Sequence, residues 1–257
     1  MKPYYRDDWV TIYHGDCREV LPGLDTGSAD LIITDPPYGL NYNNGDLAHC
    51  REAAFGGDTS RSIAKPICND GEAETDALIA WAFPEFNRLL SDGSCCCCCG
   101  GGGGPKPLFA RWTLLLDEAI GFKQAVVWDK GGLGMGIHFR RSYEFMLIAQ
   151  KGAPCRVWNG GNTTSNVWRI NKIIPREQDH PTPKPPELMG YCVDLFSNPG
   201  DYVLDPFMGE GPTIQSAKLR GRHAIGIEIE ERYCEIAAKR CAQEVLNLTN
   251  ELPVDKG

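Results

Sequence analysis

The sequence lacks any long hydrophobic run: no apolar stretch approaches the roughly 18 residues that a membrane-spanning helix requires. The N-terminal residues contain no apolar core typical of a secretory signal. The twelve cysteines include no separate Cys-x-x-Cys pair, and the five histidines show no metal-ligand spacing. These absences exclude a membrane protein and a zinc ribbon. They predict a cytoplasmic protein with reduced thiols and no bound metal.

The composition is that of an ordinary globular protein, with 42% hydrophobic and 23% charged residues. A chain of 257 residues is long enough to bury a sizeable core. Hydrophobic segments with the spacing of strands and of helices alternate along it. We therefore predict one domain, residues 1–257, of the α/β class with a mostly parallel central sheet and helices on both faces.

The segment 31–38 reads Leu-Ile-Ile-Thr-Asp-Pro-Pro-Tyr, a buried strand that stops at an acid, two prolines and an aromatic residue. Each proline fixes its own φ angle and holds the residue before it extended. The carboxylate of Asp35, the carbonyl of Pro36 and the flat ring of Tyr38 would then face a planar ring that carries an amino group. By itself the motif would more often be a structural turn.

A second motif, at residues 201–213, favours a functional site over a structural turn. It reads Asp-Tyr-Val-Leu-Asp-Pro-Phe-Met-Gly-Glu-Gly-Pro-Thr and predicts a strand, an acid, a glycine loop and a helix. The next predicted strand, 223–227, ends at Glu228, about 20 residues after the glycine loop, where an acid suits a ribose diol. Glycines let a ligand approach the backbone at a helix N-terminus. Together these features indicate a cofactor that contains adenosine.

The two motifs together resemble the amino-methyltransferases that use S-adenosylmethionine to methylate exocyclic nitrogens of DNA bases. Three further segments fit the family: His-Gly-Asp-Cys at 14–17, His-Pro-Thr-Pro-Lys-Pro at 180–185, and 226–233. The catalytic motif precedes the cofactor loop, as in the circularly permuted beta group. Pro183 and Pro212 replace the usual glutamine and threonine of that group.

The resemblance implies a Rossmann-like methyltransferase fold, with one antiparallel strand at the sheet edge, and a set of site residues. The implied catalytic residues, which would hold a flipped-out base, are Asp35, Pro36, Pro37 and Tyr38. The implied cofactor residues are Asp16, Cys17, Asp35, Thr182, Lys184, Asp205, Phe207, Gly209, Gly211, Thr213 and Glu228. Within them, Glu228 would bind the ribose, while Asp16 and Cys17 would lie near the adenine. Thr182 and Lys184 would lie near the methionine carboxylate.

The net charge of −8 is unusual for a DNA-binding protein, but the charge is unevenly distributed. Residues 121–185 carry a net +6, which leaves −14 for the rest of the chain. We therefore expect DNA to contact this basic segment, unless the charges cluster there by chance. The DNA-binding candidates are Lys130, Arg140, Arg141, Arg169 and Lys172.

Three segments need separate interpretation. Residues 39–75 are predicted to form a long loop over the active site, and residues 153–179 a short target-recognition segment. The five cysteines 95–99 are followed by five glycines. We interpret the cysteines as a buried central strand, because adjacent strand residues point to opposite faces and cannot close one metal site. A second nucleotide site at the glycine run is the weaker alternative.

The leading interpretation is adenine-N6 methylation of DNA, because an acid before Pro-Pro-Tyr is commoner in the family's adenine enzymes. Cytosine-N4 methylation is the near alternative, and RNA or protein-glutamine methylation is more distant. A DNA-binding module without catalysis and a dinucleotide-dependent oxidoreductase are the other classes considered. The sequence leaves open the recognised DNA site, a homodimer, and a restriction endonuclease partner.

Overall fold

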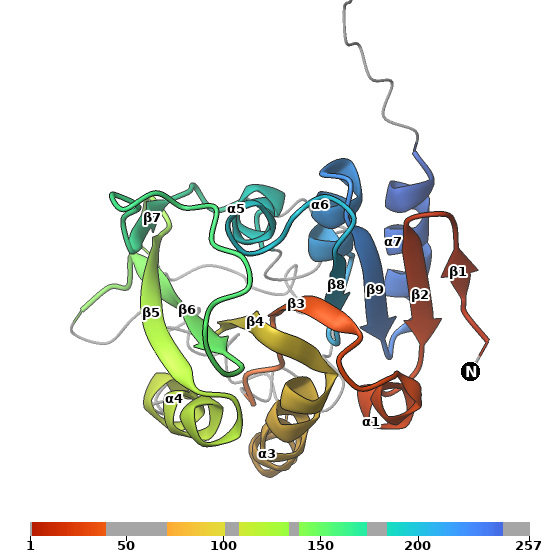
Figure 1. Cartoon of the computed structure of the whole chain (residues 1–257), viewed down its shortest axis with the longest axis horizontal. Coiled ribbons are helices and arrows are strands. Elements are labelled where there is room, and N and C mark those ends of the chain that lie inside the picture. Colours follow the sequence, from red (N-terminus) through yellow and green to blue (C-terminus); the bar gives the residue numbers. More distant parts are fainter. Residues whose placement is uncertain (1, 40–70, 101–107, 134–138, 174–183, 244–257) are drawn as a thin grey trace, which may run out of the picture.

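A computed structural model describes residues 2–39, 71–100, 108–133, 139–173 and 184–243. They form one nine-stranded sheet in the order β1-β2-β9-β8-β3-β4-β6-β5-β7, with helices on both faces (Figure 1). The α/β prediction is therefore confirmed. The strands are β1 Tyr5–Arg6, β2 Val10–His14, β3 Ala29–Thr34, β4 Leu90–Cys99, β5 Phe122–Asp129, β6 Tyr143–Gln150, β7 Val167–Arg169, β8 Tyr202–Asp205 and β9 His223–Glu228.

Most strands run parallel, so their carboxyl ends meet at one end of the sheet. β2, β9, β8, β3 and β4 pair in parallel, and β7 pairs in parallel with β5. β6 is antiparallel to both β4 and β5, and the two-residue β1 is antiparallel to β2. The expected antiparallel strand at the sheet edge is present as β1, but a second and longer reversed strand, β6, lies inside the sheet. Because β6 is reversed, its first residues lie at the end of the sheet where the parallel strands have their carboxyl ends.

The helices divide into two layers, each with its own hydrophobic core (Figure 1). One core lies between the sheet and α5, α6 and α7, and the other between the sheet and α1, α3 and α4. A parallel sheet covered on both faces needs strands that are apolar throughout, as Leu31, Ile32 and Ile33 are in β3. The helices are α1 Cys17–Val20, η1 Leu21–Gly23, α3 Glu72–Leu89, α4 Leu108–Ala119, α5 Pro186–Phe196, α6 Pro212–Leu219 and α7 Glu231–Ala242.

The five cysteines form the end of β4, as predicted, and all are buried. Cys95, Cys97 and Cys99 belong to the core under α5 to α7, whereas Cys96 and Cys98 belong to the opposite core. The alternation follows from the pleat of a strand. The thiols are therefore shared between two faces of the sheet rather than gathered at one point.

Two predicted loops need correction. Of the predicted loop 39–75, residues 40–70 lie outside the described residues, and residues 72–75 belong to helix α3. Pro84 lies inside α3, which begins twelve residues before it, at Glu72. Within the predicted recognition segment 153–179, residues 174–179 lie outside the described residues, and Trp168 is buried in β7. This burial makes Trp168 unavailable for base stacking.

Candidate active site

The catalytic motif follows directly from the carboxyl end of β3. Thr34 ends the buried strand, and Asp35 and Tyr38 are only partly buried after it. The Tyr38 hydroxyl donates a hydrogen bond of 2.6 Å to Asp35 Oδ1. Burial, together with the Asp35 charge, raises the pKa of Tyr38 well above its usual value, so the phenol keeps its proton. The Tyr38 ring packs on Trp112, with 5.7 Å between the ring centroids.

Lys184 occupies a place that the sequence did not indicate. Its Nζ donates to Asp35 Oδ2 at 2.8 Å and lies 3.2 Å from the Tyr38 hydroxyl and 3.6 Å from Glu144 Oε2. The Lys184 side chain is only 5% exposed. Burial lowers the pKa of Lys184, but Asp35 and Glu144 outweigh burial and raise it above its ordinary value. Lys184 is therefore an ammonium that bonds to the catalytic acid.

Glu144, which we did not identify from the sequence, completes this charged group. It is the second residue of β6, and it also pairs with Lys130, whose Nζ lies 3.0 Å from Oε1. An acid near the start of an otherwise apolar strand is a signal that could have identified it. The reversed strand β6 puts this acid beside the active site.

The glycine loop follows β8. Asp205 is the last residue of β8, and the Phe207 amide donates to its Oδ1 at 3.1 Å. Burial raises the pKa of Asp205 to about 7. Gly209 and Gly211 have φ angles of 52° and 79°, in the left-handed region that glycine tolerates. Gly211 is the N-cap residue of α6, with proline at the first helical position.

Glu228, the last residue of β9, bonds to the backbone of the glycine loop. Glu228 Oε2 accepts from the Gly209 amide at 3.0 Å, and Oε1 accepts from the Glu230 amide at 2.8 Å. β2 ends beside Glu228, because His14 is its register partner. Asp16 therefore lies near this acid, caps α1 and pairs with Arg18, and Cys17 is buried.

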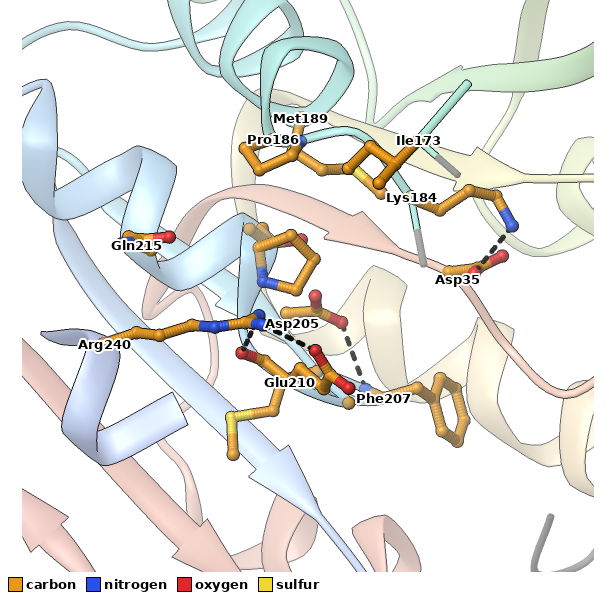
Figure 2. Close-up of a pocket in the computed structure, with 14 residues that line it drawn as sticks. Asp35, Ile173, Lys184, Pro186, Met189, Asp205, Phe207, Glu210, Gln215 and Arg240 are labelled. Atoms are coloured by element: carbon orange, nitrogen blue, oxygen red, sulfur yellow. Dashed lines mark hydrogen bonds and ion pairs between the residues drawn. The ribbon is translucent and has the colours of Figure 1, made fainter. Parts of the chain in front are cut away.

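One cavity joins the catalytic motif to the glycine loop (Figure 2). Asp35 and Lys184 lie on one side, and Asp205 and Phe207 on the other. Gly209 and Thr213 also line it, whereas Asp16, Cys17, Gly211 and Glu228 lie outside the lining. Thr182 lies outside the described residues.

The glycine loop fits a cofactor that approaches its backbone. A Cβ at Gly209 would meet nothing within 4 Å, so the backbone there borders open space. On α7, Arg240 bonds to the side chain and the carbonyl of Glu210, at 2.6 and 2.9 Å, and holds the loop in place. The remaining acceptor capacity of Glu228 suits two ribose hydroxyls.

The basic segment divides between the two ends of the sheet. Arg169 and Lys172 are exposed, and Arg140 and Arg141 lie just before β6; all four are near the carboxyl end of the sheet. Lys151 and Arg156 instead pair with acids at the opposite end, among them Asp92 and Asp201. Lys130 is largely covered by its pairing with Glu144.

Two further findings concern the described residues alone. No group of three or more histidine, cysteine, aspartate or glutamate side chains there is arranged to hold a metal ion. None of the helices in the described part of the chain is long and apolar enough to cross a bilayer.

Known proteins resemble both the sequence and the fold. The N6/N4 methyltransferase profile, described as DNA methylase, matches residues 29–239. M.HinfI, a type II methyltransferase from Haemophilus influenzae, is 30% identical over 93% of this chain and 70% of its own. The DNA adenine methyltransferase YhdJ from Escherichia coli is 27% identical over 90% of this chain and 82% of its own.

Among solved structures, TTHA0409 from Thermus thermophilus, described as a DNA modification methylase complexed with S-adenosyl-L-methionine, has a TM-score of 0.65. It is 27% identical and covers 92% of this chain and 94% of its own. The cytosine-N4-specific PvuII methyltransferase has a TM-score of 0.71 at 18% identity, which shows a shared fold alone. The match to the profile covers most of the chain, and the chain belongs to the DNA methylase family.

Proposed function

We propose that this protein transfers a methyl group from S-adenosylmethionine to the exocyclic N6 of adenine in DNA. The observation that carries the proposal is the single cavity lined by Asp35 and by the glycine loop at 205–213. An acceptor for an amine and a cradle for an adenosine cofactor thus border the same space. A relative named as a DNA adenine methyltransferase, YhdJ, supports adenine as the base.

The catalytic motif would act on the amine of a base that has left the duplex. The lone pair of an aromatic amine is delocalised into the ring, which makes it a weak nucleophile. Hydrogen bonds from its two protons to Asp35 and to the Pro36 carbonyl favour a pyramidal nitrogen with a localised lone pair. The Asp35 carboxylate then stabilises the positive charge that develops on this nitrogen. Tyr38 supplies a face on which the base stacks.

The cofactor, when bound, supplies an electrophilic methyl group. Glu228 would accept hydrogen bonds from the ribose, and Asp16 and Cys17 would border the adenine. Asp205, Phe207, Gly209, Gly211 and Thr213 would hold the methionine part near Asp35. Holding the two reactants in line supplies much of the acceleration.

The test is to treat unmethylated DNA with the purified protein and S-adenosylmethionine, and to analyse the nucleosides by mass spectrometry. We expect N6-methyladenine. N4-methylcytosine without methyladenine would overturn the choice of base. If no DNA base is methylated while RNA or protein is, the substrate class is wrong.

Variants at Asp35 test the mechanism. Asp35→Ala removes the acceptor and Asp35→Asn removes its charge, so each should slow transfer by roughly 10²–10³-fold. Affinity for S-adenosylmethionine, measured by calorimetry, should change little, because the Asp35 side chain is assigned to the base amine rather than to the cofactor. Asp92→Asn, an exposed acid at the opposite end of the sheet, is the matched control. Equal rates for the control and Asp35→Asn would refute the role of Asp35.

A homodimer, a restriction endonuclease partner and a cytoplasmic location remain predictions. DNA would approach the carboxyl end of the sheet, where Arg140, Arg141, Arg169 and Lys172 lie. Lys130 is the weakest of the five DNA-binding candidates, since Glu144 already neutralises its charge.

A further inference from the structure

The Lys184 ammonium lies between two carboxylates, one catalytic and one with no assigned role. It bonds to Asp35 Oδ2 at 2.8 Å, and Glu144 Oε2 is 3.6 Å away on its other side. Asp35 Oδ1 accepts from Tyr38 at 2.6 Å. Both oxygens of the catalytic acid therefore already accept a hydrogen bond from the protein.

This arrangement opposes the proposed reaction unless it changes. Each Asp35 oxygen can accept a second hydrogen bond, so the base amine still has an acceptor, but the Lys184 ammonium draws on the negative charge that this amine needs. Methyl transfer also places positive charge on the amine nitrogen, and a neighbouring ammonium raises the energy of that charge. Methyl transfer is therefore favoured when the Lys184 ammonium is held by an acceptor other than Asp35.

Glu144 has the properties of that acceptor. Burial alone would raise the pKa of Glu144, but Lys184 and Lys130 hold it below its usual value, so the side chain is a carboxylate. Its Oε1 accepts from Lys130, whereas its Oε2 is buried and has no hydrogen-bond partner among the residues that the structure describes. An unfilled buried acceptor is costly, and it is directed at the Lys184 ammonium.

We propose that Glu144 is a positioning residue of methyl transfer, which receives the Lys184 ammonium when the base amine takes its place on Asp35. A movement of about 1 Å would shorten the 3.6 Å separation to an ordinary charged hydrogen bond. Lys184 then remains paired while Asp35 is free for the base. This inference rests on the proposed function, because it assigns a role in the same reaction.

The test compares Glu144→Gln and Glu144→Asp with the parent protein. Glutamine keeps an acceptor for Lys130 but lacks the charge that draws Lys184 from Asp35. We expect kcat to fall by about 10- to 100-fold, the size of one hydrogen bond between charged groups. Affinity for S-adenosylmethionine and the melting temperature should stay near those of the parent. Glu144→Asp should recover most of the lost rate, because it restores the charge.

Glu118→Gln, an exposed acid on α4, is the control and should keep the parent rate. A parent-like kcat for Glu144→Gln would overturn the inference. So would a loss shared equally by Glu144→Asp, or one explained by weaker cofactor binding, since both indicate a purely structural role. If the parent itself methylates no DNA, the proposed function fails instead, so the two failures are distinguishable.

Discussion

Asp205 is a buried acid whose ionisation should make the stability of the protein depend on pH. Burial raises its pKa to about 7, against an ordinary value of 3.8. Between these values the folded protein retains a proton that the unfolded chain has released. The free energy of unfolding therefore contains a contribution that is full below about pH 4 and is lost as pH rises towards 7.

Asp205→Asn should remove this dependence, because the amide keeps an acceptor for Phe207 but never ionises. Relative to the parent, the variant's stability should increase by about 3 kcal/mol between pH 5 and pH 8, because about two pH units of this window lie below the pKa of about 7. Urea denaturation of both proteins without cofactor, at both pH values, measures the difference. A stability difference that is the same at both pH values would contradict the assignment.

At the scale of residues, the sequence predicted that Asp35 and the glycine loop border one cavity, but it missed how Asp35 is bonded. Asp35, Asp205 and Glu228 were placed correctly at strand ends, since an acid after an apolar run marks such an end. The hydrogen bond from Lys184 to Asp35 was missed, because 148 residues separate the two and only the sheet order brings them together. Glu144 was missed because the strand that carries it was assigned no role.

Among the elements, the turn from β8 into α6 depends on Gly211. Its φ angle is 79°, and a Cβ there would lie 2.8 Å from the Cβ of Ala237 in α7. Gly27 has a similar φ angle of 72°, but a Cβ there would meet nothing within 4 Å. Substituting Gly27 therefore tests backbone strain alone, whereas substituting Gly211 tests strain together with a steric clash.

Gly27→Ala should cost about 1–2 kcal/mol, the penalty for a side chain in the left-handed region. Gly211→Ala should cost more, because α7 must also move, and it should weaken binding of S-adenosylmethionine. Chemical denaturation and calorimetry of both variants provide the comparison. If the two variants lose the same stability and Gly211→Ala still binds S-adenosylmethionine normally, then α7 accommodates the added Cβ and the close contact has no consequence.

The strand β4 gives a prediction about reactivity. Cys96 to Cys99 are buried, and burial raises the pKa of each thiol, Cys96 to about 12. Since the thiolate is the reactive form, these four should resist alkylation in the native protein, whereas the exposed Cys155 should react. Mass spectrometry of labelled peptides before and after denaturation checks this, and elemental analysis should find no stoichiometric metal. Rapid native labelling of β4 would contradict its burial.

The type of each major element could be predicted, and the neighbours of one strand could not. Apolar runs identified β3, the end of β4, β8 and β9. Such runs carry no information about direction, so the place of β6 between β4 and β5 was not predicted. Pro84 does not end α3, although proline disfavours a helix interior, because tertiary packing of Phe83 and Phe86 stabilises the helix around it.

On the scale of the whole molecule, DNA binding should weaken steeply with salt despite the net charge of −8. Each phosphate contact adds about 0.9 to the slope of log affinity against log salt. Arg169→Ala should lower this slope by about one contact, because its side chain is 85% exposed at the carboxyl end. Lys239→Ala, an exposed cation on α7, should leave it unchanged. Titrations at several salt concentrations measure the slope, and a flat parent slope would place the DNA elsewhere.

The basic segment shows the limit of counting charges along a chain. Its net +6 was read as one surface, yet Lys151 and Arg156 lie at the opposite end of the sheet from Arg169. Because a strand carries the chain from one end of the sheet to the other, residues 20 apart can face opposite directions. Only the three-dimensional arrangement identifies which cations face the same way.

The sheet order has a consequence for how the protein is made. The catalytic strand β3 is synthesised early, but its neighbour β8 and the partner of β2, β9, come from residues 202–228. A nascent chain that has not passed this point holds the catalytic acid beside an open strand edge, with no glycine loop opposite it. An unpaired strand edge exposes backbone hydrogen-bonding groups, so it can pair with other chains until β8 and β9 have been synthesised. An interrupted translation product would therefore be inert as a methyltransferase and prone to aggregation, and activity would begin only once the last strands close the sheet.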